Sequence, residues 1–452
     1  MYFAQVWPGS VKPHRGKWDD SLPVAENIEV NDSSSSGVQP GGPYKFPTRP
    51  WRGRRTLVLG IAMLALNIRL AVTAVSPVID RLRGDIPLSD ELYGWLGTIP
   101  VICFAMLGIA TPKIARQLGL EWATVLALGL SVAGQLGRAL SDGSVEFVAW
   151  TVVAMAGLGI SNVLLPPLVK AYFPDRMSLV TGIYVTSLTL SSAIPALAAV
   201  PLADSGGWRF SLGIWGAFGA AAMVPWLFAI LRDGGARLAP KLPAPAVAQT
   251  APTRDEPPVV GKIWRSPSAW GMGVMMGLNS FIVYVMFAWL PTMLTDASVP
   301  EATAGTMLAT YSFLGIAGAF LGPWMINRAR HYLLVIFAVL SMYLVGFGGL
   351  LLAPGAAPWL WITALGLGGS VFQILLALIN VKARSTSSAA QLSGFAQGLG
   401  YTLAALGPVL VGYLHGAGAG WNVVYLVLLG CVLVSAAAAP VVTRRTVVED
   451  EW

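Results

Sequence analysis

The 452-residue chain is 55% hydrophobic and only 11% charged, and its mean hydropathy is +0.65. A soluble domain is about one-quarter charged, so this composition excludes an ordinary soluble protein and indicates an integral membrane protein. The formal net charge of +7 does not indicate nucleic-acid binding, because the basic residues lie in short clusters between apolar runs, as topology signals do.

The chain offers no residue set for a metal or for a disulfide framework. Cys103 and Cys431 both lie inside apolar runs, where we expect them to act as small buried hydrophobes. The histidines, His14, His331 and His415, lie in the N-terminal region and at the ends of apolar segments. We therefore expect neither a metal site nor a cofactor.

The N-terminal region differs sharply from the rest of the chain. Residues 1–50 are rich in Pro, Gly and Ser, which predicts a disordered tail, and they contain no apolar core of a secretory signal. After them, apolar runs long enough to cross a hydrocarbon core of ~30 Å follow one another closely. They predict about twelve spanning helices, at 56–79, 92–112, 121–140, 146–169, 178–200, 209–231, 267–294, 304–326, 332–353, 358–380, 391–414 and 421–441.

A polar, Pro-rich interval divides these spans into two groups of six. We predict an N-terminal tail, a six-helix bundle, a linker, a second six-helix bundle and a C-terminal tail, with the boundaries 1–50, 51–231, 232–265, 266–441 and 442–452.

The two bundles resemble each other at an offset of 211 to 213 positions. The matched pairs are Asn67 and Asn279, Pro112 and Pro323, Gly182 and Gly394, and Trp208 and Trp421. Parallel repeats joined by a loop are typical of a transporter whose site lies between its halves.

Basic residues predict the orientation, because short cytoplasmic loops carry an excess of Lys and Arg. Most of them fall on one side of the predicted spans: Arg52, Arg54, Arg55, Lys113, Arg116, Lys170, Arg176, Arg328, Arg330, Lys382, Arg384, Arg444, Arg445 and six residues of the linker. The other side has Arg81, Arg83 and Arg209, with Arg138 near a helix end. We therefore predict that both termini and the linker are cytoplasmic.

Several stretches between residues 52 and 441 carry a resemblance to a known family. They are Leu66–Arg69, Thr98–Phe104, Gly108–Gly119, Ser161–Lys170, Phe173–Arg176, Thr181–Tyr184 and Leu392–Tyr401. With these residues the chain resembles the major facilitator superfamily, and within it the branch of cyanate permeases and 2-nitroimidazole transporters.

The resemblance implies an all-α integral membrane protein with the major facilitator fold, about twelve transmembrane helices in two six-helix repeats. It also implies solute transport by alternating access in a plasma or bacterial inner membrane, with no enzymatic activity. The implied partners are a small-molecule solute and the lipid bilayer, without nucleic acid, and we expect a monomer. The 108–119 stretch is similar to the loop that carries the family signature between helices two and three, but Thr111 and Pro112 stand where an aspartate is usual. We assign structural or gating roles to Pro112, Lys113, Arg116, Gly182 and Gly394.

Arg69 is the strongest candidate for a substrate-binding residue. It lies near the middle of the first apolar run, where a charge is unfavourable by roughly 2.5–3.5 kcal/mol on insertion scales. Thr73 and Ser76 share its helical face, with the small residues Ala62 and Ala65, as expected for a cavity wall. The alternative is a cation that holds backbone carbonyls or a helix end. The helix-mate Asn67 points almost the opposite way and has the repeat partner Asn279, so we assign both asparagines a structural role.

Further polar residues in mid-membrane positions are candidates for solute contact. Asn162 precedes Pro166 and Pro167, which free backbone carbonyls, and it is balanced between ligand and packing roles. The phenols of Tyr184, Tyr284 and Tyr311 can stack or donate to an anion, although aromatic core filling is the alternative. The remaining candidates are Gln373, Gln397 and Tyr401.

All 22 acidic residues fall in tails, loops or helix ends of the predicted topology. A lone buried cation attracts an anion, so we predict a small anion or compact polar solute with Arg69 as its counter-charge. A drug exporter of the same fold is the first alternative. A membrane-embedded enzyme lacks a clustered nucleophile, base or metal set, and a non-transporting receptor lacks a substantial soluble region.

Overall fold

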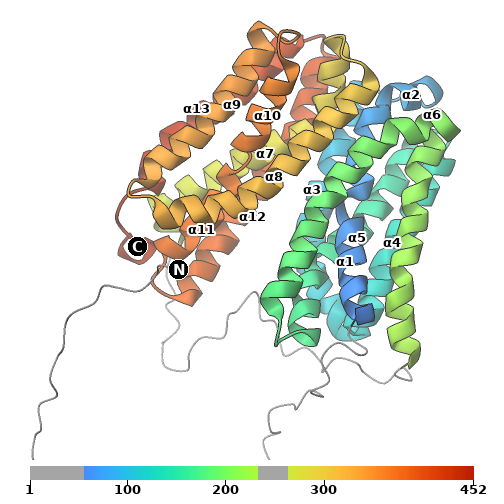
Figure 1. The fold of residues 1–452 in the computed structure, drawn as a ribbon, viewed down its shortest axis with the longest axis horizontal. Helices are drawn as coiled ribbons and strands as arrows, with labels where there is room; N and C mark the ends of the chain where they lie inside the picture. Colours follow the sequence, from blue (N-terminus) through green and yellow to red (C-terminus); the bar gives the residue numbers. More distant parts are fainter. Residues whose placement is uncertain (1–54, 233–262, 452) are drawn as a thin grey trace, which may run out of the picture. The chain divides into compact units, whose positions relative to one another are not determined.

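The computed structural model describes residues 55–232 and 263–451, and the regular structure within them is helical (Figure 1). The predicted disordered tail and most of the predicted linker lie outside the described residues. The described helices all belong to one unit of the chain, residues 51–452.

The first half of the described chain contains η1 (Ser76–Val78) and six α-helices: α1 (Arg55–Thr73), α2 (Ile79–Asp85), α3 (Asp90–Leu118), α4 (Leu120–Leu140), α5 (Ser144–Tyr172) and α6 (Met177–Arg232). The second half contains η2 (Ile263–Arg265), α7 (Pro267–Asp296), α8 (Glu301–Arg328), α9 (Tyr332–Leu352), α10 (Pro358–Gly368), α11 (Val371–Lys382), α12 (Thr386–Gly416), α13 (Trp421–Val442) and η3 (Val448–Asp450).

Within the described residues, ten helical segments are long and apolar enough to cross a membrane. One of them, α6, is interrupted at Gly206 and Gly207 and therefore comprises two spans. Gly207 adopts a φ of 77°, which residues other than glycine rarely adopt. With α6 counted as two spans, the ten segments contain eleven spans, and the 28-residue α8 is the twelfth. This number equals the one predicted from the sequence. The predicted integral membrane fold is therefore confirmed.

The main correction concerns the stretch 108–119, which the resemblance indicated as a loop. It forms the last turns of α3, which continues through Pro112 and ends at Leu118, so that only Gly119 separates α3 from α4. Proline does not end a helix in a packed membrane bundle as readily as it does in a soluble protein. Polar residues such as Lys113 therefore mark where the helix leaves the apolar layer rather than where it stops.

The sequence repeat is matched by equivalent hydrogen bonds. The indole Nε1 of Trp208 donates to the Asp85 carboxylate at 2.7 Å, at the end of the first span. The indole Nε1 of its repeat partner Trp421 donates to the Asp296 carboxylate at 2.7 Å, at the end of α7. The two halves thus use the same tryptophan–aspartate bond at corresponding places.

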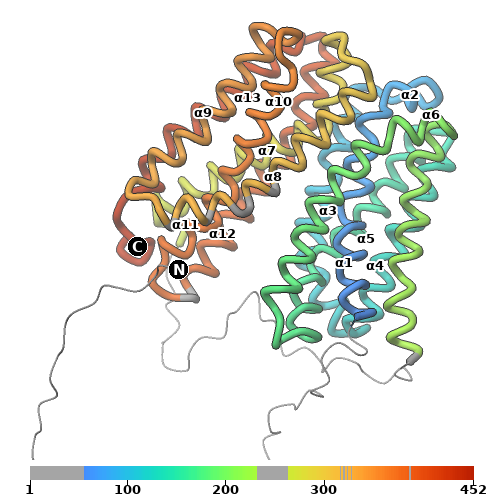
Figure 2. Tube along the Cα trace, in the orientation of Figure 1, coloured from blue at the N-terminus to red at the C-terminus, as the bar shows by residue number. Residues whose placement is uncertain are grey.

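Packing within each half is more extensive than packing between the halves. In the first half α1 packs on α5 and α6, and α4 packs on the same two helices. In the second half α7 packs on α12 and α13, and α9 packs on α10 and α13. Contacts between the halves are made mainly by α3 with α12 and by α6 with α8, and the tube in Figure 2 follows these helices along the chain.

The C-terminal segment after α13 packs against the beginnings of two helices. Glu449 accepts a hydrogen bond from the backbone N–H of Arg384, ahead of α12, at 2.8 Å. Glu451 accepts one from the backbone N–H of Ser268, in the first turn of α7, at 3.1 Å. Val448, just before them, is buried. Because carboxylates favour helix N-termini, this segment holds α7 and α12 together at their starts.

Candidate functional site

The two halves meet closely at the end of the bundle where α2 lies, α3 begins and α12 ends, which we call the α2 end. Glycines make this approach possible. A Cβ atom at Gly94 of α3 would lie 2.6 Å from the backbone oxygen of Pro408 in α12. A Cβ at Gly412 of α12 would lie 2.5 Å from the backbone oxygen of Asp90 in α3. The backbones of α3 and α12 are therefore in direct contact at this end.

Polar bonds reinforce the contact at the α2 end. Arg81 of α2 donates two bonds to the Glu301 carboxylate of α8, from Nη2 at 2.7 Å and from Nε at 3.0 Å, and it also pairs with Asp204 at 2.8 Å. The Tyr93 hydroxyl donates to the Ala288 carbonyl of α7, and Thr98 donates to the Ala405 carbonyl of α12 at 2.8 Å.

Toward the opposite end, four glycines of α3, α6, α8 and α12 make no such contact between the halves. At Gly108 of α3, Gly182 of α6, Gly315 of α8 and Gly394 of α12, no atom of the described residues lies within 4 Å of the place a Cβ would occupy. Gly182 and Gly394, assigned structural or gating roles from the sequence, therefore do not mediate helix packing in this conformation. The halves therefore meet at the α2 end, whereas the space beside these four glycines is open.

Arg69 lies on α1 at the level where the two halves face each other. Its guanidinium carbon is 5.8 Å from the ring centroid of Phe287 in α7, and its charge acts on the phenols of Tyr284 in α7 and Tyr401 in α12. Among the described residues no carboxylate forms an ion pair with it. Thr73, one turn further along α1, is buried. Its hydroxyl donates to the backbone carbonyl of Arg69 at 3.2 Å, which is a hydrogen bond within the same helix.

An aromatic cluster continues from Arg69 into the second half. Phe287 is in edge contact with Tyr284, at 6.3 Å between ring centroids, and with Tyr311 of α8, at 6.1 Å. The buried Tyr311 hydroxyl lies beside that of Tyr343 in α9, but the geometry does not satisfy a hydrogen bond between them. Tyr343 instead donates to the Asn279 side chain of α7 at 2.9 Å, and the structural role of Asn279 stays a prediction.

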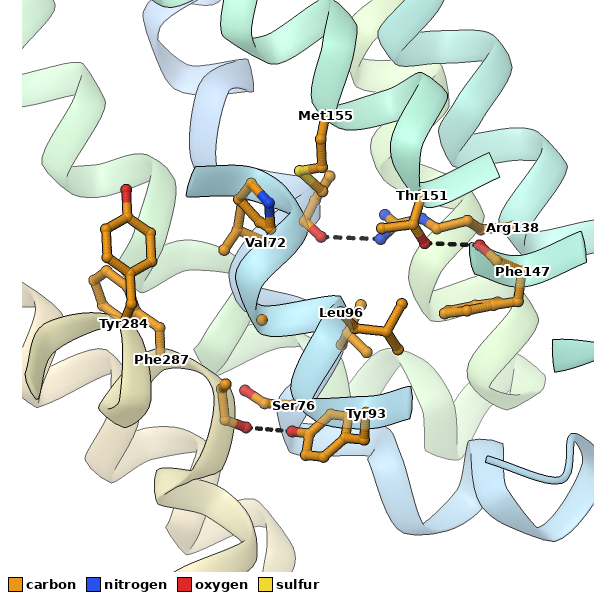
Figure 3. A pocket seen from close by; sticks show the side chains of 15 residues that line it. Val72, Ser76, Tyr93, Leu96, Arg138, Phe147, Thr151, Met155, Tyr284 and Phe287 are labelled. Atoms are coloured by element: carbon orange, nitrogen blue, oxygen red, sulfur yellow. Dashed lines mark hydrogen bonds between the residues drawn. The ribbon is translucent and has the colours of Figure 1, made fainter. Parts of the chain in front are cut away.

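A cavity lies beside this cluster, between α1, α3, α4, α5 and α7 (Figure 3). Its volume is about 440 Å³, which includes the solvent space at its mouth. Tyr284 and Phe287 line one side, and Arg138 of α4 lines another. Arg138 was missed as a site residue because it stands two positions before the end of the predicted span 121–140. Phe287 was missed because aromatics are common in membrane helices, although its spacing of three from Tyr284 places both on one helical face.

The other predicted site residues are not gathered at Arg69. Asn162 is exposed on α5, and Tyr184 is half-buried on α6. Gln373 of α11 packs against Gly322, and the Gln397 amide donates to the Ser393 hydroxyl of its own helix at 2.7 Å. Asn67 is fully buried, and both of its side-chain polar atoms lack hydrogen-bond partners among the described residues.

The three signature residues Pro112, Lys113 and Arg116 are exposed on the last turns of α3. Their predicted gating role remains a prediction.

A bundle of membrane-crossing helices in two similar halves, with polar groups between the halves and one end closed, defines a secondary transporter. Residues 57–405 match the Major Facilitator Superfamily, and the chain belongs to this family. It is 33% identical to the 2-nitroimidazole transporter of Escherichia coli, over 82% of this chain and 91% of that protein. It is 32% identical to the transporter YycB of Bacillus subtilis, over 84% and 92%, and 26% identical to the cyanate transport protein CynX of Escherichia coli, over 85% and 97%.

Solved structures agree on the fold. The nucleoside transporter NupG is similar with a TM-score of 0.69 at 12% identity, over 86% of this chain and all of that one. A bacterial homologue of the lysosomal transporter Spinster, in an inward-facing and occupied conformation, is similar with a TM-score of 0.65 at 17% identity, over 90% and 99%.

Proposed function

We propose that this transporter moves a small anion or a compact polar solute, cyanate-like or nitroheterocycle-like, by alternating access, with Arg69 as the counter-charge. The observation that carries the proposal is the setting of Arg69. Its half-buried guanidinium faces the second half of the bundle and has no ion pair among the described residues. A cation held away from bulk water attracts an anion.

The surrounding groups suit a small solute. Tyr284 and Tyr401 offer hydroxyl donors near the charge, and Phe287 offers a ring face for a planar solute. Relatives named for cyanate and for 2-nitroimidazole support a compact solute of this kind. An exporter of lipophilic cations is less consistent with a region whose charged residues, Arg69 and Arg138, are both basic.

The orientation is also a proposal. Clusters of Lys and Arg around the end opposite α2 support a cytoplasmic location for that end, for both termini and for the linker. The bundle, closed at its α2 end, then corresponds to a conformation open toward the cytoplasm in a plasma or inner membrane.

Uptake by reconstituted protein tests the role of Arg69. Proteoliposomes are assayed with radiolabelled cyanate and 2-nitroimidazole for the wild type, Arg69→Ala and Arg69→Lys. Charge-assisted hydrogen bonds contribute about 1.5–3 kcal/mol, so we expect Arg69→Ala to weaken apparent anion affinity by roughly 10- to 150-fold, and Arg69→Lys to retain part of it.

Arg328→Ala is the matched control, because Arg328 is exposed at the end of α8, where its guanidinium lies 5.0 Å from the Trp324 ring centroid and forms no ion pair among the described residues. It should transport like the wild type. Unchanged uptake by a correctly inserted Arg69→Ala protein would contradict the counter-charge role.

A further inference from the structure

His415 faces the other half of the bundle at the α2 end. It lies in the last turn of α12, and its Nε2 is 4.0 Å from Oδ2 of Asp90, in the first turn of α3. Each of the two side chains is 24% exposed. A distance of 4.0 Å is too long for a hydrogen bond, so a neutral imidazole gains little from Asp90. The pair spans the interface between the halves, because α3 belongs to the first half and α12 to the second.

Aromatic rings hold the imidazole of His415 in place. It stacks on Trp421 of α13, with 4.5 Å between ring centroids and 22° between ring planes. Trp289 of α7 packs against it edge-on at 5.7 Å and donates its indole N–H to the Pro408 carbonyl of α12 at 3.2 Å. The Nδ1 atom of His415 is buried and has no hydrogen-bond partner among the described residues. The imidazole is therefore positioned by packing, and no hydrogen bond at Nδ1 fixes its protonation state.

The charged groups near His415 on α3 and α2 favour a positive charge on it. Besides Asp90, α3 places Glu91 there, with its Oε1 2.5 Å from the place that a Cβ at Gly416 would occupy. Arg83 of α2 opposes these carboxylates, but its Nη2 already pairs with Oδ1 of Asp90 at 2.6 Å. The other oxygen of Asp90 is the one that faces His415. Two carboxylates and one guanidinium leave the surroundings of His415 net negative.

The remaining elements around His415 add no positive charge. Asp296 is the charged residue of α7, and its carboxylate accepts the Trp421 indole N–H at 2.7 Å. α13 and the rest of α12 contain no charged residue. The tyrosines of these helices, and Tyr93 of α3 beside Trp289, are phenols, which are neutral below about pH 9. The last carbonyls of α12 and the stacked indole also attract a cation.

A proton on His415 would turn the contact with Asp90 into an ion pair between the halves. Histidines gain their charge between about pH 8 and about pH 5, where carboxylates remain ionised. The imidazolium and Asp90 attract each other only while α3 and α12 are together, so the attraction is lost when the halves separate. Protonation therefore lowers the free energy of the conformation closed at the α2 end relative to that of the open one.

We propose that His415 and Asp90 form an acid latch, a proton-binding pair that holds the α2 end closed at low pH and releases it at high pH. In the orientation proposed above, the α2 end faces outward, so external acid favours the conformation open toward the cytoplasm. The acid latch rests on the alternating access of the proposed function, but it depends neither on the solute nor on Arg69.

Spin-label distances measured at two pH values test the acid latch. Labels replace exposed Val145 in the first half and exposed Ala356 in the second, in full-length protein whose two cysteines are replaced by alanine. Between pH ~8 and pH ~5 we expect the ratio of closed to open protein to rise about fivefold, which is the size of effect expected from a partly exposed ion pair with a cation at a helix C-terminus.

Substitutions of His415 separate its charge from its packing. His415→Gln is neutral at every pH, so its distances should not respond and should resemble those of the wild type at pH ~8. His415→Arg carries a permanent charge that can stack on Trp421, so it should hold the closed conformation at both pH values. His331→Gln is the matched control, because His331 is exposed immediately before α9, at the opposite end, and this variant should respond like the wild type.

Asp90→Asn should abolish the response, although it also removes the pair with Arg83. The acid latch is wrong if wild-type distances are the same at both pH values, if the response persists in His415→Gln or Asp90→Asn, or if His331→Gln removes it. Uptake by Arg69→Ala tests the proposed function separately. A pH response in a protein that transports no anion would support the acid latch and contradict the counter-charge role. Arg69-dependent uptake without a pH response would do the reverse.

Discussion

Replacing Gly94 by alanine should force apart the two halves at the α2 end. The added Cβ would lie 2.6 Å from the Pro408 backbone oxygen and 3.1 Å from the Val409 Cα, and neither atom belongs to a flexible side chain. Overpacking of this kind is unfavourable by about 1–3 kcal/mol. The gain of about 1 kcal/mol in helix propensity applies to both conformations and cancels. The closed conformation should therefore lose roughly 5- to 150-fold in population.

Gly108→Ala is the matched control. Gly108 lies on the same helix, and no atom lies within 4 Å of the place its Cβ would take, so alanine there adds helix propensity without a clash. The two variants thus differ in the contact with α12 and not in the chemical change.

Distances between spin labels measure the population. Val145, at the start of α5, and Ala356, before α10, are exposed positions on opposite halves at the α2 end. They are labelled after Cys103 and Cys431 have been replaced by alanine. Electron–electron double resonance should show a longer distance gaining weight in Gly94→Ala and not in Gly108→Ala. Identical distance distributions for the two variants, in monodisperse protein, would refute the reasoning.

Two further predictions concern the ends of the bundle. Glu301→Gln should weaken the bidentate pair with Arg81, which is partly exposed, by about 1 kcal/mol, and shift the same label distances toward opening about fivefold. In a double-mutant cycle with Arg81→Gln, additive effects would show that the pair does not couple the halves. At the other end, burial raises the pKa of Glu451, but hydrogen bonds from Ser266, Ser268 and Thr446 outweigh burial and hold that pKa below its ordinary 4.5. Because a lowered folded-state pKa stabilises the protein above the unfolded value, this contribution is complete above pH 4.5 and disappears as the pH falls through the folded pKa. Melting temperatures measured from pH ~6 to ~3 should therefore fall less steeply for Glu451→Gln than for the wild type, and equal slopes would exclude this role.

α3 and α12 carry glycines both at the α2 end and toward the opposite end. At the α2 end, α3 and α12 meet backbone to backbone through Gly94 and Gly412. Further along the same helices, Gly108 and Gly394 have open space beside them. Helices that carry small residues at both levels can approach at either one, which is what alternating access requires of them.

The sequence by itself determined the class of protein, the number of spans and the repeat. Each of these depends on a one-dimensional property: the length of an apolar run, the bilayer thickness it must match, or the recurrence of residues such as Trp208 and Trp421 at a constant offset. The intramembrane charge of Arg69 was visible for the same reason, because a charge inside an apolar run stands out without knowledge of its neighbours. Helix ends were less well determined, as the helical 108–118 stretch shows, because polar residues mark the edge of the apolar layer and not the end of hydrogen bonding.

Tertiary structure alone decided which residues face each other. Arg69 meets Phe287, more than two hundred positions away, only through the rotation and tilt of α1 and α7. The same holds for Arg138, which a reading of the sequence places at a helix end but which packing buries completely in a cavity. Side-chain orientation depends on how helices pack against one another, and close packing is a property of surfaces brought together from distant parts of the chain. The composition predicted a membrane protein and the repeat predicted a transporter, whereas helix packing left Arg69 half-buried between the halves and Arg138 fully buried in a cavity.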